Sequence, residues 1–183
     1  VDEAIECYQR AIELMPDYAN AHHNLGMALY KKGEADAAIE HYRKAIELDP
    51  NHASVRNSLG VALYQKNKLD EAIEQYRQAI AIHAGYVSAH DNLGIALKQQ
   101  GNLEEASHHF LQAIQLRPDY ANAYINLGNT MRELGKFEEA IAYCQEAIRL
   151  QPTNSDAHNT YGCVLVDLAR FEDAIDCYEE AIR

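Results

Sequence analysis

The sequence has 183 residues, of which 48% are hydrophobic, and its formal net charge is −12 at pH 7. Nucleic acids and anionic membrane surfaces attract basic proteins, so this charge argues against both as partners. No apolar run approaches the length of a membrane-spanning helix, and no secretory signal is visible. The four cysteines show no framework spacing, so we expect reduced thiols in a cytoplasmic protein.

A period of 34 residues runs through the whole chain. The triplet Asn24-Leu25-Gly26 returns as Asn92-Leu93-Gly94 and as Asn126-Leu127-Gly128, with related triplets at 58–60 and 160–162. Self-similarity at this period indicates a repeat protein, in which neighbouring units bury a continuous core. Numbering each repeat from its first residue puts the glycine of the triplet at position 8. Those first residues are Ala19, Ala53, Val87, Ala121 and Ser155.

Each repeat is predicted to contain two helices, which we call helix A and helix B. Small residues recur at positions 8, 20 and 27, with a large residue at position 24, a pattern that lets two helices approach closely. Glycine or asparagine at position 15 ends helix A, and proline at position 32 ends helix B. In chain order, helices are expected at about 1–14, 20–32, 35–48, 54–66, 69–82, 88–100, 103–116, 122–134, 137–150, 156–168 and from 171 onward.

Two joints depart from this pattern. Ala169 stands at position 15, where a left-handed backbone is expected, so we expect that turn to be built differently from the others. The segment 83–86, of sequence HAGY, lacks the proline of position 32 and contains a glycine. Its greater backbone freedom predicts a more mobile joint than the equivalent segment 117–120.

These residues resemble the tetratricopeptide repeat: small at positions 8, 20 and 27, aromatic at 24 and proline at 32. The resemblance implies an all-α, right-handed superhelical solenoid of antiparallel helix pairs, with helices A lining a concave groove. Because the sequence begins inside a repeat, we expect a fragment of a longer protein. The predicted organisation is a single array with a half repeat consisting of helix B only (1–18), full repeats at 19–52, 53–86, 87–120 and 121–154, and a nearly complete repeat without a capping helix at 155–183.

Position 4 departs from the family pattern, which favours a large apolar residue there. We expect this substitution to make the contact more polar and looser. The residues at this position are His22, Arg56, His90, Tyr124 and His158.

The resemblance implies a non-catalytic scaffold for protein–protein interaction, without a cofactor, that binds an extended peptide or partner segment in the groove. On helix A, positions 2, 6, 9 and 13, flanked by 5 and 12, share one face, which the family geometry places in the groove. Every repeat carries asparagine on this face, and an amide can both donate to and accept from a peptide backbone. Helices spaced roughly 8–10 Å apart match about three extended residues per repeat. The predicted groove residues are Asn20, Asn24, Met27, Tyr30, Asn57, Val61, Tyr64, Asn92, Ile95, Asn122, Asn126, Asn129 and Asn159.

Two roles for the asparagines stay open: they face a ligand, or they are surface residues that tie one repeat to the next. Asn24, Asn92 and Asn126 are similar to a ladder in the superhelical arm of O-linked N-acetylglucosamine transferases, whereas Ser58 and Thr160 interrupt it. The alternatives are therefore the substrate-presenting arm of a larger enzyme, such as a glycosyltransferase, or a self-assembling structural spacer. For ligand-facing asparagines we expect replacement by alanine to weaken binding and to leave stability nearly unchanged.

Other site chemistries are not predicted. Carboxylate-clamp tetratricopeptide domains use Lys and Arg at positions 2, 5 and 6 of helix A, and no Lys or Arg stands at these positions here. The nine histidines include no His-x-x-x-His pair that could chelate a metal from one helix face. No phosphate-binding loop or nucleophile motif occurs. Ile175, Tyr178 and Ile182 on the last helix have no following helix A, which predicts end-to-end self-association.

Overall fold

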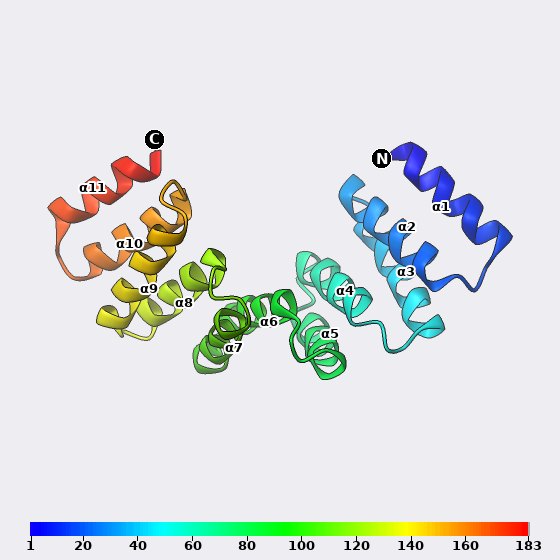
Figure 1. The fold of residues 1–183 in the computed structure, drawn as a ribbon, viewed down its shortest axis with the longest axis horizontal. Coiled ribbons are helices and arrows are strands. Elements are labelled where there is room, and N and C mark those ends of the chain that lie inside the picture. The colour runs from blue at the N-terminus through cyan, green and yellow to red at the C-terminus, as the bar shows by residue number, and fades with distance from the viewer. Residues whose placement is uncertain (183) are drawn as a thin grey trace. The chain divides into compact units, whose positions relative to one another are not determined.

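The computed structural model describes residues 1–182, which form helices joined by short turns (Figure 1). Eleven helices and no strand are found in that span, and none of them is long and apolar enough to cross a membrane. The helices begin and end within one residue of their predicted bounds. They are α1 (Asp2–Leu14), α2 (Ala19–Lys32), α3 (Ala35–Leu48), α4 (Ala53–Gln65), α5 (Leu69–Ile82), α6 (Val87–Gln99), α7 (Leu103–Leu116), α8 (Ala121–Glu133), α9 (Phe137–Leu150), α10 (Ser155–Asp167) and α11 (Phe171–Ile182).

The chain divides into two compact units, residues 1–96 (unit 1) and the residues from 97 onward (unit 2). Within unit 1, α2 packs antiparallel to α3 and α4 packs antiparallel to α5, and α2 also touches α4. Within unit 2, the corresponding pairs are α8 with α9 and α10 with α11, and α8 touches α10. The predicted all-α fold of antiparallel helix pairs is confirmed.

In unit 1, each helix pair closes on a contact between a glycine and a tyrosine. A Cβ atom added to Gly26 would lie 2.6 Å from Cε1 of Tyr42, and one added to Gly60 would lie 2.5 Å from Cε1 of Tyr76. Both tyrosines are only 2% exposed. Glycine at position 8 is therefore required because the ring at position 24 occupies the space of its side chain.

Unit 2 uses the same contact with one change. A Cβ on Gly162 would lie 2.6 Å from Cε1 of Tyr178, whereas one on Gly128 would meet Sγ of Cys144 at 2.9 Å. Cys144 is fully buried, and burial raises the pKa of its thiol to about 12. A thiol held in its neutral form is a poor nucleophile, so Cys144 is a packing residue.

The turn after helix A is built in the same way in every repeat. Its position-15 residue has a left-handed backbone, with φ 90° at Gly33 and φ 57° at Ala169. The backbone N–H of Ala169 donates to Val166 O and that of Arg170 to Leu165 O, both at 2.9 Å. The expectation of a different turn at Ala169 is therefore wrong, because the two hydrogen bonds hold an alanine in a conformation that costs roughly 1–2 kcal/mol. The same conformation occurs at Asn67, Gly101 and Gly135.

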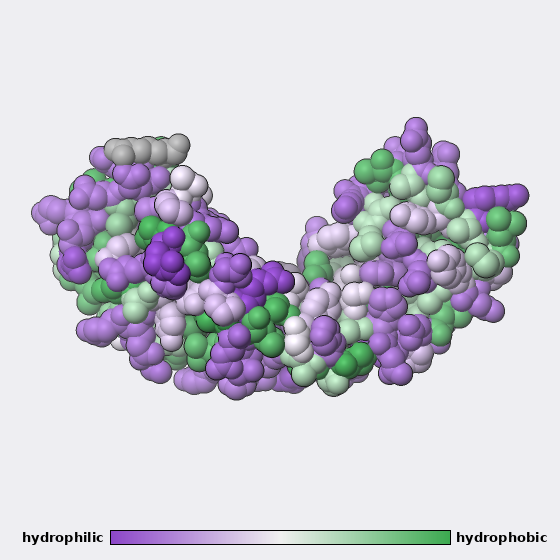
Figure 2. Space-filling view, viewed as in Figure 1, coloured by the Kyte–Doolittle hydropathy of each residue, from purple (hydrophilic) through white to green (hydrophobic). Residues whose placement is uncertain are grey.

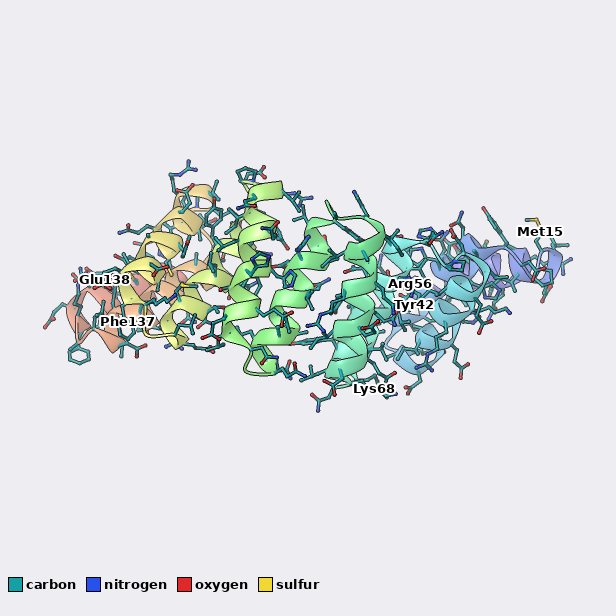
Figure 3. The ribbon with its side chains drawn as sticks, turned by 90° about the horizontal axis from the view of Figure 1, so that it is seen from below. Met15, Tyr42, Arg56, Lys68, Phe137 and Glu138 are labelled. Carbon is teal, nitrogen blue, oxygen red and sulfur yellow. The ribbon has the colours of Figure 1, made fainter. Side chains whose placement is uncertain are left out.

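Side chains at position 4 of helix A form hydrogen bonds with the backbone of the turn that precedes the helix. The Nε2 atoms of His22, His90 and His158 lie 3.0, 3.0 and 2.8 Å from the carbonyl oxygens of Pro16, Ala84 and Pro152. Since a carbonyl oxygen only accepts, Nε2 carries the proton in each pair. Arg56, labelled in Figure 3, donates to Pro50 O from Nη2 at 2.9 Å and from Nε at 3.2 Å. At these four residues the contact is polar, as expected, but hydrogen bonds hold it and it is not loose.

The HAGY joint keeps the turn of its proline-containing counterpart. The backbone N–H of Tyr86 donates to His83 O at 3.0 Å, and that of Tyr120 donates to Arg117 O at 3.1 Å. The proline is therefore not needed to form this turn. The greater mobility of the joint stays a prediction.

Candidate functional site

The groove face of unit 1 contains a hollow between α2 and α4. Its volume is about 190 Å³. It brings together four of the predicted groove residues with three residues that were not selected from the sequence. The predicted ones are Met27, Tyr30, Asn57 and Val61, and the others are Lys31, Tyr42 and Ser58.

A second hollow, of about 200 Å³, adjoins the first between α1 and α2. The two hollows share Met27 and Lys31, so they lie side by side, and we call them together the unit 1 groove. Asn24 lines the second hollow. The other lining residues of the second hollow are Val1, Ala4, Tyr8 and Ala28.

The unit 1 groove has an apolar floor and phenolic walls. Met27 is 38% exposed, and Tyr30 and Val61 are half-buried. Burial, and then the nearby phenol of Tyr30, raise the pKa of Tyr42 to about 12. The phenol of Tyr42, which lines the first hollow, therefore stays neutral and carries an O–H group beside apolar surface.

One pair of predicted groove asparagines is used inside the protein. Nδ2 of Asn92 donates to Oδ1 of Asn57 at 3.0 Å, which links α6 to α4. Asn57 is only 9% exposed. Burial raises the pKa of Tyr86, and a hydrogen bond with Asn57 partly offsets that rise. The oxygen of the Asn57 amide thus has a partner in Asn92, and this pair ties one repeat to the next.

The equivalent contact in the preceding repeat has a different composition. Nε2 of His23 lies 3.2 Å from Oγ of Ser58, again joining position 5 of one helix A to position 6 of the next. Both hydrogen bonds join residues that are 35 positions apart, so the same polar contact recurs between neighbouring helices A. The sequence could have indicated it, because both partners in each pair are polar.

The remaining asparagines differ in what they contact. Asn24 is half-buried and has no hydrogen-bond partner among the described residues. Asn126, by contrast, has a partner. Of the other predicted asparagines, Asn20, Asn122 and Asn159 are exposed and Asn129 is half-buried.

The groove face of unit 2 has a different chemistry. Position 12, which holds Tyr30 and Tyr64 in unit 1, holds Lys98 and Arg132 in unit 2. Nζ of Lys98 lies 2.9 Å from Oε1 of Glu133. Nη1 of Arg132 lies 3.4 Å from Oδ2 of Asp167. These charges neutralise one another between neighbouring helices A, so they offer a ligand little net charge.

Apolar side chains on the visible surface are dispersed. Figure 2 shows hydrophilic residues over much of the face seen there, with hydrophobic residues in separate small clusters within each unit. Small clusters of this kind are ordinary on protein surfaces. Among residues 1–182, no group of three or more His, Cys, Asp and Glu side chains is arranged to hold a metal ion.

Comparison with known proteins identifies the repeat. A tetratricopeptide repeat model matches residues 23–87 and 92–155, and further models of this repeat match residues 1–33 and 131–183. A search of curated proteins finds no match. The likeness of the asparagines to the arm of O-linked N-acetylglucosamine transferases stays a prediction.

Solved structures of similar fold cover nearly the whole chain. MamA is 25% identical with a TM-score of 0.78, and the match covers 86% of this chain and 92% of that chain. PilF of Pseudomonas aeruginosa is 26% identical with a TM-score of 0.81, over 90% of this chain and 75% of that one. YrrB is 22% identical with a TM-score of 0.79, over 97% and 92%. Because the family models span well over half of the sequence, and the helix pairs close on the expected glycine contacts, the chain belongs to the tetratricopeptide repeat family.

Proposed function

We propose that the chain is a non-catalytic scaffold that binds an extended segment of a partner protein along the groove face of its helices A. The unit 1 groove carries this proposal, because Met27, Tyr30 and Val61 converge there beside the amide of Asn24. Pockets for drug-sized ligands measure roughly 300–1,000 Å³. A hollow of about 190 Å³ suits a single side chain of a peptide better than a small-molecule ligand.

The family supports this role. Tetratricopeptide repeats typically mediate protein–protein interactions, and the models that match this chain are all of this repeat. YrrB, which shares the fold, is described as having an unusual peptide-binding site. Cut9, 21% identical with a TM-score of 0.84 over 99% of this chain and 36% of that chain, is seen in a complex with Hcn1.

The proposal assigns different roles to the asparagines. The amide of Asn24 lines the second hollow and has no hydrogen-bond partner among the described residues, so it is available to pair with a peptide backbone. The oxygen of Asn57 already accepts a hydrogen bond from Asn92, so the role of Asn57 is to maintain the shape of the groove. Amide pairing with the backbone would be similar for peptides of different sequence, and the hollow would then supply the preference for one side chain.

The test is a selection of binders to residues 1–183 from phage-displayed random short peptides, followed by measurement of Kd with variants. Asn24→Ala is expected to weaken binding by about two- to tenfold, because a net hydrogen bond contributes roughly 0.5–1.5 kcal/mol. The loss should be similar for peptides of unrelated sequence. The control is Asn51→Ala, which removes an exposed amide in the turn between α3 and α4, away from the groove. Binding that neither Asn24→Ala nor Val61→Ala weakens, for every selected peptide, would reject the proposal.

A further inference from the structure

The unit 1 groove holds one lysine side chain that has no ion-pair partner among the described residues. Lys31 is exposed, lines both hollows, and makes no ion pair with any described residue. Its neighbour Lys32 is engaged, with Nζ 3.1 Å from Oδ1 of Asp2 and 3.3 Å from Oε1 of Glu34. The free charge is therefore specific to the lysine that faces the groove.

No other Lys, Arg, Asp or Glu shares the groove face of α2 and α4 with Lys31. Positions 2, 5, 6, 9, 12 and 13 of these two helices otherwise carry amide, hydroxyl, imidazole, thioether and aliphatic groups. On α2 they are Asn20, His23, Asn24, Met27 and Tyr30, and on α4 they are Ser54, Asn57, Ser58, Val61, Tyr64 and Gln65. Lys31 is therefore the only Lys, Arg, Asp or Glu at the groove positions of α2 and α4.

The apolar floor lies directly beside this cation. Met27 lines both hollows together with Lys31, and Val61 lines the first hollow with them. Methionine adapts its shape to different apolar groups. An extended chain advances about 3.3 Å per residue, so a ligand side chain seated on Met27 and Val61 has its near neighbours within reach of Lys31.

Combining these observations, we propose that the unit 1 groove takes an extended segment of a partner protein with a large apolar side chain and an Asp or Glu one or two residues away. The apolar side chain fills the hollow over Met27 and Val61, and the carboxylate pairs with Lys31. This inference rests on the proposed groove function and specifies its ligand. Unit 2 does not share this preference, because Lys98 and Arg132 already pair with Glu133 and Asp167.

The selected random peptides test this directly. The expected consensus is a large apolar residue with an acidic residue one or two positions away. For a synthetic peptide of that consensus, Lys31→Ala should weaken binding roughly two- to fivefold, and the difference from wild type should shrink as salt is added. Val61→Ala should weaken binding more than about fivefold if Val61 forms the anchor site.

Exchanging the charges of Lys31 and of the peptide residue tests whether the two form a direct ion pair or interact only through the overall charge of the protein. Lys31→Glu should weaken binding of the acidic peptide further, and it should bind a peptide in which the acidic residue is lysine better than the wild type does. The matched control is Gln65→Glu, which adds a negative charge at position 13 of the next helix A, outside both hollows. That control should change either affinity less than twofold.

The outcomes separate the apolar–acidic ligand preference from groove binding itself. Peptides that lose affinity with Asn24→Ala but show no apolar–acidic consensus, or that ignore the charge exchange, would overturn the inference and leave groove binding standing. Peptides indifferent to Asn24→Ala and Val61→Ala alike would overturn both. Circular dichroism of each variant checks that the helices are intact.

Discussion

At the scale of single residues, Ala169 is strained, because it stands at a left-handed turn position that holds glycine or asparagine in the other repeats. Its φ is 57°, whereas three of the equivalent residues are glycines. An alanine in this conformation costs roughly 1–2 kcal/mol, and glycine recovers that energy less its own entropic cost of roughly 0.5–1 kcal/mol. We therefore expect Ala169→Gly to raise the free energy of unfolding by about 0.5–1 kcal/mol, as measured by urea unfolding.

The reverse substitution is the control for this prediction. Gly33 has φ 90°, and a Cβ added there would meet no atom within 4 Å. Gly33→Ala should therefore lower the stability by roughly 1 kcal/mol through the backbone alone. Equal stability of both variants and the wild type would show that the turn tolerates alanine without strain.

Asn92 is predicted to matter for folding, contrary to the expectation from the sequence that the asparagines leave stability nearly unchanged. Its amide donates to Asn57, whose oxygen is largely buried. Removing the donor leaves that oxygen unpaired, so Asn92→Ala should cost about 1–2 kcal/mol in urea unfolding. Asn122→Ala, at an exposed site without a described partner, should change stability by less than about 0.5 kcal/mol. An unchanged free energy of unfolding for Asn92→Ala would mean that water replaces Asn92 as the hydrogen-bond donor to Asn57.

At the scale of helices, two histidine contacts in unit 1 couple stability to pH. Nδ1 of His22 and Nδ1 of His41 lie 3.2 Å apart and join α2 to α3. Burial, and then the neighbouring His22, lower the pKa of His41 below its usual 6.5, against a small opposing effect of Glu40. Burial, and then His52, likewise lower the pKa of His23. The folded state therefore favours neutral imidazoles at both sites.

The lowered pKa values of His41 and His23 determine how stability changes with pH. Below pH 6.5 the unfolded chain binds protons that the folded chain resists, so the free energy of unfolding should fall as the pH drops from neutral to about 5. Above neutral pH it should stay level with respect to these groups. His41→Gln should reduce the fall, whereas His108→Gln, on the exposed face of α7, should leave it unchanged. Denaturant unfolding across this range checks it, and identical slopes for both variants would contradict it.

The joint between α5 and α6 is predicted to open more readily than the one between α7 and α8. Both make the same turn hydrogen bond, but segment 83–86 has a glycine and no proline, whereas segment 117–120 has a proline. A freer backbone gains more entropy on opening. Amide hydrogen exchange should therefore be faster at Tyr86 than at Tyr120. Ala84→Pro should slow it, and unchanged rates would show that the hydrogen bond alone controls opening.

At the scale of the whole molecule, the sequence predicted the features that recur every 34 residues. It did not predict contacts between side chains at different repeat positions on neighbouring helices. Helix bounds and the glycine contacts at Gly26 and Gly60 follow from residue types that recur every 34 positions. The bond from Asn92 to Asn57 joins two different repeat positions, so the period alone does not reveal it. The importance of Lys31 likewise depends on Lys32 being engaged by Asp2 and Glu34.

The last helix presents apolar side chains that the described structure leaves uncovered. On α11, Phe171, Ile175 and Ile182 are 56%, 56% and 86% exposed. Burying one such side chain contributes roughly 1.5–3 kcal/mol, so we propose that a polypeptide of residues 1–183 associates through α11. Sedimentation should show a mass that rises with concentration, and Ile175→Gln with Ile182→Gln should abolish the rise. Leu116→Gln, which removes one exposed apolar side chain at the end of α7, should leave association intact. A wild-type monomer at all concentrations would refute the prediction.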